Sequence, residues 1–306
     1  MLSLFPRRTS GRDVVSVVRP EGAIARPDAA LARLLARTRF ELVPIKSVDA
    51  AIDELAPGAT TSVTCSPVKG LGATLDVTAR LLDAGHDAVP HLAARLVEDR
   101  QHVARLAAWI HDHGLREVFI VGGDEATAAG PYADGTAFLR ELLEHDTGLA
   151  RVGVPAYPDG HPTIPGTVLR AALHDKQALI AAAGLEGSAT TQMCFDPGRI
   201  TGWLRAERAA GFVMPIDLGV PGVVDRTKLM SMGVRLGIGS SLRFLRKQRT
   251  TMTAMLGPGG YDPTDLVVAV AADAQALRID GVHSFTFNSV AKTEAWRRAL
   301  LAGEEE

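Results

Sequence analysis

Short apolar runs alternate with longer amphipathic segments along almost the whole chain, from residue 37 onward. The runs are rich in β-branched residues, which is typical of strands. They predict eight strands, at residues 38–44, 60–65, 86–92, 116–121, 151–157, 188–195, 212–218 and 283–288.

The segments between these runs have the period of an α-helix. Residues 98–113 are predicted as a helix because apolar side chains recur three or four positions apart, at Val103, Leu106, Ala107 and Ile110. Residues 263–277 show the same one-sided pattern. A further helix is predicted near Pro27–Ala36, within an Arg-, Pro- and Ala-rich beginning of the chain, either beneath the strands or beside them.

Eight strand–helix units with connections too long for hairpins indicate parallel strands. We therefore predict an α/β protein, a (β/α)8 TIM barrel at residues 37–303, with a peripheral N-terminal extension at residues 1–36. A doubly wound open sheet is the alternative, because a single sequence seldom fixes topology.

Composition narrows the class of protein. The chain has 306 residues, of which 46% are hydrophobic and 22% charged, and a formal net charge of -2, so nucleic acid is not expected as a partner. No apolar run approaches the ~20 residues that span a bilayer, and no signal peptide is evident. Cys65 and Cys194 lack metal-ligand spacing and are expected to be buried, reduced thiols. A cytoplasmic protein is predicted, without a membrane partner and of undefined oligomeric state.

Two acidic residues have unusual positions. One directly follows a predicted strand, and the other lies between two apolar residues within a predicted strand. In FIVGGDEAT, Gly122 and Gly123 allow a sharp turn after the fourth strand, and Asp124 follows at the end where barrel active sites lie. Its alternative role is the N-cap of the next helix. Glu41 lies between Phe40 and Leu42; inside a barrel its pKa would rise and make it a general acid, whereas at a strand edge it would be a solvated carboxylate.

Other polar side chains lie at the same end of successive strands. Together they offer hydrogen bonds to a flat polar heterocycle, whereas no nucleophile elbow and no metal-ligand spacing is present, so no metal site is predicted. These residues are Thr64, His91, Tyr157, His161, Gln192 and Asn288.

The order of the motifs FELVP, SVTC, VPHL, VGGD, AYPDGHP, TTQMCFD and GVHSFTFNSVAK resembles the methylenetetrahydrofolate reductase family, over about residues 38–298. The resemblance implies a (β/α)8 barrel that reduces 5,10-methylenetetrahydrofolate to 5-methyltetrahydrofolate with NAD(P)H, usually through bound FAD. Folate is then the expected small-molecule partner, in one-carbon metabolism and methionine biosynthesis.

The resemblance also implies roles for individual residues. Glu41 would protonate N10 of the folate, and Asp124 would bind the pterin and stabilise the developing cation. The other residues implied to bind substrate are Gln192, Thr64, Asn288 and Lys292. Those implied to bind a flavin or a nicotinamide are His91, Gly123, Tyr132, Tyr157, His161 and Lys176.

Three departures from the family pattern affect the cofactor. Gly122 replaces the arginine of the family's turn, and the helix before the TTQ strand ends ALIAAAG, without a basic pair for flavin phosphates. We therefore expect direct hydride transfer from NAD(P)H, with FAD loosely bound or absent. PGVV around Val223 replaces a usual aromatic residue, which leaves the stacking of substrate or nicotinamide undefined.

Two alternatives remain: a folate-binding barrel without reductase activity, and a tetrahydrofolate-linked one-carbon transferase. The segment GIGSSLRF (237–244) and the basic run Arg243, Arg246, Lys247 and Arg249 indicate either a solvated helix face or contact with a phosphate or the folate tail.

Overall fold

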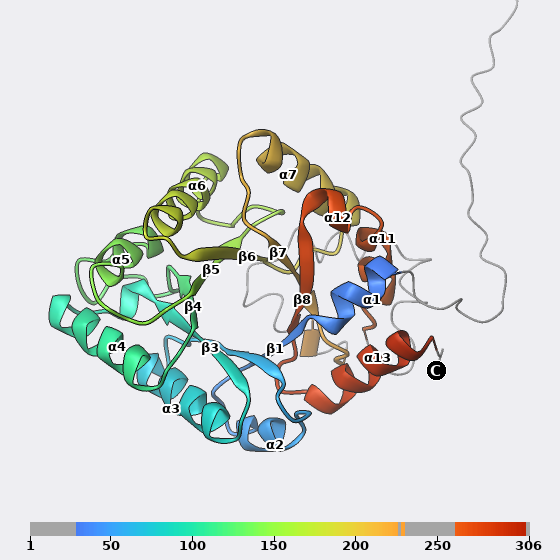
Figure 1. Ribbon diagram of the computed structural model, residues 1–306, viewed down its shortest axis with the longest axis horizontal. Coiled ribbons are helices and arrows are strands. Elements are labelled where there is room, and N and C mark those ends of the chain that lie inside the picture. The colour runs from blue at the N-terminus through green and yellow to red at the C-terminus, as the bar shows by residue number, and fades with distance from the viewer. Residues whose placement is uncertain (1–28, 226–227, 230–260, 304–306) are drawn as a thin grey trace, which may run out of the picture.

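Eight parallel strands form a closed barrel in the order β1 to β8, as Figure 1 shows, so the predicted barrel is confirmed and the open sheet is not. The computed structural model describes residues 29–225, 228–229 and 261–303. The strands are β1 (Thr38–Leu42), β2 (Thr60–Val63), β3 (Asp87–Ala93), β4 (Glu117–Val121), β5 (Arg151–Ala156), β6 (Glu186–Thr191), β7 (Ile216–Pro221) and β8 (Ile279–Phe285).

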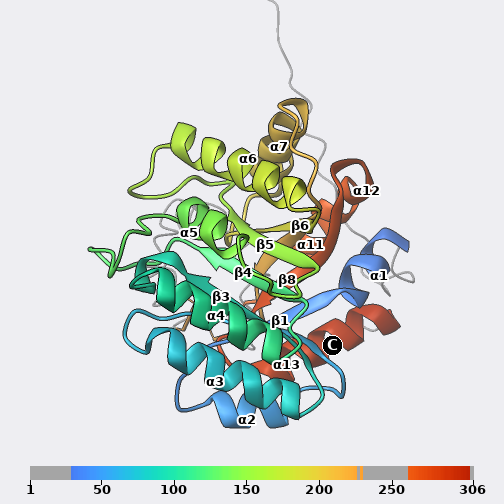
Figure 2. The ribbon, with the colours of Figure 1, turned by 60° about the vertical axis from the view of Figure 1, so that its left-hand side comes forward.

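Helices surround the ring of strands, and Figure 2 shows α3 to α6 along its outer side. The described helices are α1 (Ala29–Ala36), α2 (Val48–Asp53), α3 (Gly70–Asp83), the short 3₁₀ turn η1 (Ala94–Leu96), α4 (Arg100–Asp112), α5 (Gly135–Leu142), α6 (Gly166–Ala182), α7 (Pro197–Ala209), α11 (Thr264–Ala271), α12 (Ala274–Leu277) and α13 (Val290–Ala302). Within the described residues, none of them has both the length and the apolar character needed to cross a bilayer.

The N-terminal helix lies beside the barrel. Helix α1 packs against α11, α13 and β8, and its buried leucines belong to the same core as these elements. The segments 1–28, 237–249 and 304–306, with the predicted basic run, lie outside the described residues.

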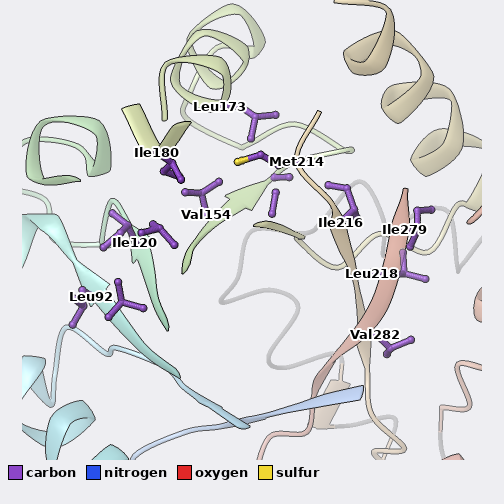
Figure 3. Packing of buried hydrophobic residues seen from close by; sticks show 14 of the residues in the cluster. Leu92, Ile120, Val154, Leu173, Ile180, Met214, Ile216, Leu218, Ile279 and Val282 are labelled. Carbon is purple, nitrogen blue, oxygen red and sulfur yellow. The ribbon is translucent and has the colours of Figure 1, made fainter. Parts of the chain in front are cut away.

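The strands hold the barrel together through their outward-facing side chains. Alternate residues of a strand face opposite sides, and those that face the helices are buried and apolar. Figure 3 shows such residues between strands and helices, with Ile120 on β4, Val154 on β5 and Leu218 on β7 around the ring, and Ile180 of α6 opposite Val154. At about 25 cal/mol per Å² of buried apolar surface, this layer is the main driving force of the fold.

The inward-facing side chains at the amino-terminal end of the strands are charged. Arg39 donates two hydrogen bonds of 2.8 Å to the Glu117 carboxylate, and both side chains are buried. Asp87, Asp217 and Arg151 surround this pair and line a cavity of about 370 Å³ with it. The closed ring therefore has a compensated charge cluster at one end.

Three of the predicted strands differ from the observed strands by four residues at one end, and the others by no more than two. Residues 212–214 precede β7 in a connection, where Phe212 is buried beneath the guanidinium of Arg208 at 4.8 Å. Strand β8 begins at Ile279 instead of residue 283, because Gly281 lets the chain pass close to β1: a Cβ there would lie 2.5 Å from the Arg37 carbonyl oxygen. Strand β6 begins and ends earlier than predicted.

Two further details differ from the prediction. Residues 286–288 lie past the end of β8, and Phe287 and Asn288 have left-handed φ values of 49° and 62°. The single helix predicted at residues 263–277 is divided into α11 and α12. Neither cysteine forms a disulfide among the described residues; Cys194 is buried and Cys65 is half-buried.

We predict that Arg39→Met lowers the free energy of unfolding by about 3 to 5 kcal/mol, because it leaves the buried Glu117 carboxylate without its cation. Urea unfolding of both proteins measures the change. The control is Asp49→Asn, which removes the ion pair between Asp49 and Arg80. The side chain of Asp49 is 71% exposed and that of Arg80 is 47% exposed. It should cost less than about 1 kcal/mol. Equal losses in the two variants would contradict the role of the buried pair.

Candidate active site

Glu41 of β1 faces the inside of the barrel. Its neighbours Phe40 and Leu42 belong to the outer core with α2, so the carboxyl between them lies on the other side of the sheet. Its side chain is only 9% exposed. Burial penalises the carboxylate and raises its pKa to about 7, while His91 opposes this shift. Glu41 is therefore an acid that holds its proton close to neutral pH.

Two imidazoles approach the same oxygen of this carboxyl. His283 Nε2 of β8 lies 3.0 Å from Glu41 Oε2, within hydrogen-bond distance. His91 Nε2 of β3 lies 3.9 Å from that oxygen and has no hydrogen-bond partner. Burial lowers the pKa of His91 to about 4 and that of His283 to about 3. Both rings are therefore neutral at the pH at which Glu41 titrates.

Aromatic rings keep water away from this group. Phe119 of β4 lies beside His91, with ring centroids 4.6 Å apart, and Phe285 lies beside His283 at 5.1 Å. Low local polarity is the physical reason why a carboxyl and two imidazoles all favour their neutral forms here. We call Glu41, His91 and His283 the inner cluster.

The inner cluster also bears on metal binding. Its three potential ligand atoms lie within 4.8 Å of one another, and carboxylate and imidazole groups are ligands of divalent transition ions. No metal-ligand spacing is visible in the sequence because the cluster comes from β1, β3 and β8, which are far apart in the chain. His283 was not among the predicted site residues, although it is a polar side chain buried inside a strand, as Glu41 is.

Asp124 lies at the carboxyl-terminal end of the barrel, three residues after β4. Gly123 has a φ of 97°, which an L side chain rarely adopts, and thereby forms the turn that exposes Asp124. The helix that follows is capped by Asp134, so the alternative N-cap role of Asp124 is wrong.

Tyr157 and His161, from the loop after β5, lie close enough to Asp124 to be affected by its charge. Burial, followed by this charge, raises the pKa of Tyr157 to about 12. Burial lowers the pKa of His161, and Asp124 opposes this shift. The two rings contact each other edge to face, with centroids 5.5 Å apart. The structure thus brings together three of the predicted residues, which we call the rim cluster.

Arg95 holds the loop that carries Asp124. From η1, its guanidinium donates hydrogen bonds of 2.7, 2.8 and 3.0 Å to the carbonyl oxygens of Glu125, Ala126 and Ala133. These contacts fix the loop and leave little capacity for binding a phosphate. The sequence contained no sign of this role, because Arg95 reaches a segment some thirty residues away.

Three predicted substrate residues lie at strand ends but are engaged by the protein itself. The Asn288 amide donates to the Val43 carbonyl and to Ser47 Oγ, and accepts from the Val43 amide at 2.8 Å, which ties the end of β1 to the end of β8. Gln192 Oε1 accepts from the Met193 amide, which leaves the Gln192 side-chain amide group for a ligand. Thr64 follows β2, and its carbonyl accepts from Thr74.

Three other predicted residues lie apart from both clusters. Tyr132 packs edge-on against Phe138 and lines a surface groove between α4 and α5 with Asp99, Arg100 and Glu141. Lys176 is buried on α6, where burial lowers its pKa to about 8 and Asp134 opposes the shift. Lys292 is exposed on α13 and pairs with Asp225 at 3.7 Å.

The position of α6 in the barrel explains why a basic pair at the end of this helix would not serve a ligand near Asp124. The last turn of α6, where the basic pair was sought, lies at the opposite end of the barrel from Asp124, because each helix runs antiparallel to its strand. The first half of α6 carries Arg170, whose guanidinium is engaged by Glu207 at 3.1 Å. This guanidinium is therefore engaged within the protein, as that of Arg95 is.

No protein-family model matches the chain. Among solved structures, it is similar to an uncharacterized protein from Clostridium thermocellum that binds two copies of 5-methyl-5,6,7,8-tetrahydrofolic acid, with 12% identity, a TM-score of 0.56, and coverage of 89% of this chain and 96% of the other. A type I 3-dehydroquinate dehydratase from Clostridium difficile has 10% identity, a TM-score of 0.41, and coverage of 87% and 93%. At this level of identity and with its TM-score, the first likeness shows the barrel fold.

The raised pKa of Glu41 predicts a pH-dependent difference in stability. Below an unfolded pKa of about 4.3 both states are protonated, and above it the folded state holds a proton that the unfolded state has lost. The stabilising contribution is thus present at low pH and is lost as pH rises toward about 7. Relative to Glu41→Gln, the wild type should lose about 2 to 4 kcal/mol between about pH 4 and pH 8. Urea unfolding of both proteins at several pH values measures this; parallel curves would contradict it.

Proposed function

We propose that this protein reduces 5,10-methylenetetrahydrofolate to 5-methyltetrahydrofolate by hydride transfer from NAD(P)H. The observation that carries this proposal is the buried carboxyl of Glu41, which has a pKa of about 7 and lies among neutral imidazoles on the inside of the barrel. A binding protein does not need a proton donor of this kind, whereas opening of the folate's five-membered ring does.

Two independent likenesses support folate as the substrate. The motifs from FELVP to GVHSFTFNSVAK follow the order of the methylenetetrahydrofolate reductase family. The similar barrel from Clostridium thermocellum binds 5-methyl-5,6,7,8-tetrahydrofolic acid, which is the product of the proposed reaction. Neither likeness alone specifies the chemistry, which follows from the inner cluster.

The proposed reaction needs one proton and one hydride. The proton of Glu41 passes to N10 as the bond between N10 and the bridging carbon breaks, which leaves a carboxylate and an iminium cation at N5. A hydride from the nicotinamide then adds to the bridging carbon and gives the 5-methyl group and NAD(P)⁺. Water returns a proton to Glu41 before the next turnover. The low polarity around Glu41 keeps the carboxyl protonated near neutrality, so the acid that the first step needs is present.

The rim cluster has a complementary task in this scheme. Asp124 carries a negative charge at the end of β4, where it stabilises the iminium cation and accepts hydrogen bonds from the pterin. The free amide group of Gln192 donates to the same heterocycle. Thr64, His91, Tyr157 and His161, on β3 or on the segments that follow β2 and β5, remain for the pterin or the nicotinamide.

The residues present do not fit FAD. Gly122 provides no cation, and the guanidinium groups of Arg95 and Arg170 are engaged by the protein. Of the positions that the family pattern assigns to the cofactor, Tyr132 and Lys176 lie apart from both clusters. Each charge-assisted contact to a phosphate contributes roughly 1.5 to 3 kcal/mol to binding. Without these contacts to its phosphates, FAD should bind much more weakly. Direct transfer from NAD(P)H is therefore the route that we propose.

A second candidate is a folate-binding barrel that carries out no reduction. It is favoured by the similarity to the Clostridium thermocellum protein, which binds the methylated folate. A third, transfer of the one-carbon unit to an acceptor, would consume no reduced nicotinamide.

We predict that the purified protein oxidises NAD(P)H only when 5,10-methylenetetrahydrofolate is present, and that added FAD does not increase the rate. The measurement is absorbance of the reduced nicotinamide, together with the flavin content of the same sample. Folate binding without nicotinamide oxidation would favour the binding barrel. Stoichiometric bound flavin that is needed for turnover would contradict direct transfer.

We predict that Glu41→Gln lowers kcat by about 10²- to 10⁴-fold while folate binding is largely retained, because the amide preserves shape but donates no acidic proton. In the wild type, kcat should fall as pH rises above about 7, where Glu41 loses its proton. Steady-state kinetics and calorimetric folate binding test both points. Glu144→Gln, on the surface after α5, is the matched control. Unchanged turnover in Glu41→Gln would remove the acid from its role.

A further inference from the structure

The two oxygens of the Glu41 carboxyl have different surroundings. Both imidazole contacts are made to Oε2, from His283 at 3.0 Å and from His91 at 3.9 Å. No other residue that the structure describes forms a hydrogen bond with either oxygen. Only the shorter contact is a hydrogen bond, since 3.9 Å is beyond the range for such bonds. His283 alone can therefore distinguish one oxygen of the acid from the other.

The surroundings of His283 indicate which of its nitrogens carries the hydrogen. Its Nδ1 is buried and has no hydrogen-bond partner. A buried N–H without an acceptor is rarer and more costly than a bare lone pair, so the hydrogen belongs on Nε2, where it has an acceptor. In this tautomer His283 donates to Oε2 of Glu41.

The charges around the ring keep it in this neutral state. Burial has the largest effect on the pKa of His283, followed by the positive charge of Arg39, and both lower it. The groups that face His283 and Glu41 from the packed strands are Arg39 of β1, His91 of β3, Glu117 of β4 and Asp217 of β7. Asp217 and Glu117 oppose the effect of Arg39, but both are compensated by that same arginine in the charge cluster.

We propose that His283 is a positioning residue that directs the proton of Glu41 to Oε1 and stabilises the carboxylate formed when this proton leaves. An oxygen that already accepts an N–H bond is the poorer site for the proton, so the proton occupies the other oxygen. After the transfer, the N–H bond strengthens because its acceptor becomes charged. This inference rests on the proposed function for its catalytic consequence, whereas the direction of the hydrogen bond can be tested without it.

Two amide variants separate the hydrogen bond from the bulk of the ring. His283→Gln places an N–H near the position of Nε2, while His283→Asn places its amide near Nδ1, too far from Glu41. Loss of a donor to a carboxylate should raise the pKa of Glu41 by about one to two pH units in His283→Asn, and His283→Gln should stay near the wild type. The exposed residue His111 provides the control variant His111→Gln.

The readout is infrared titration of the Glu41 carboxyl, identified by the band that Glu41→Gln removes. A fall in this pKa in His283→Asn would overturn the proposal, because it would mean that Glu41 donates to His283. No change in either variant would overturn it as well. If the asparagine variant does not fold, the ¹⁵N spectrum of wild-type His283 decides: a hydrogen on Nδ1 contradicts the proposal.

Kinetics then connect the hydrogen bond to turnover. In His283→Asn, the fall of kcat with pH should move to higher pH and its maximum should decrease about tenfold or more, with KM for folate unchanged. A merely structural role would lower activity at all pH values without moving the profile. If the infrared result holds but the wild type oxidises no nicotinamide, the proposed function fails while the positioning role stands.

Discussion

The closed ring of strands imposes the constraint on which the site depends: a carboxyl on the inner face of β1 is almost completely removed from bulk water. Phe119 and Phe285 line the same region, and the imidazoles of His91 and His283 are themselves neutral. No cation within hydrogen-bond distance compensates Glu41 among the described residues, so protonation is the least costly way to bury it. The raised pKa of Glu41 is therefore a consequence of its position inside the closed barrel.

The charge cluster at the amino-terminal end supports this arrangement. Arg39 neutralises Glu117 there, and its positive charge also lowers the pKa values of His91 and His283. Arg39 and Glu41 are two residues apart on β1 and face the same side. One strand therefore contributes both the cation that balances the end of the barrel and the acid at its centre.

The sequence allowed the fold and part of the site to be predicted. Eight apolar runs were sufficient for the barrel, and Glu41 stood out because a carboxylate between Phe40 and Leu42 is unusual in a strand. His283 was missed because the predicted strand began at that residue, which hid its place in the middle of β8. The positions of Tyr132 and Asn288 depend on loop conformations, including a left-handed turn at Asn288, that periodicity does not report.

The most direct test of the account is a crystal structure with bound 5-methyltetrahydrofolate. The account predicts the pterin at the carboxyl-terminal end of the strands, with N10 at about 2.6 to 3.2 Å from Glu41 Oε1 and the heterocycle in contact with Asp124. A pterin bound outside the barrel mouth, or one whose N10 faces away from Glu41, would contradict it.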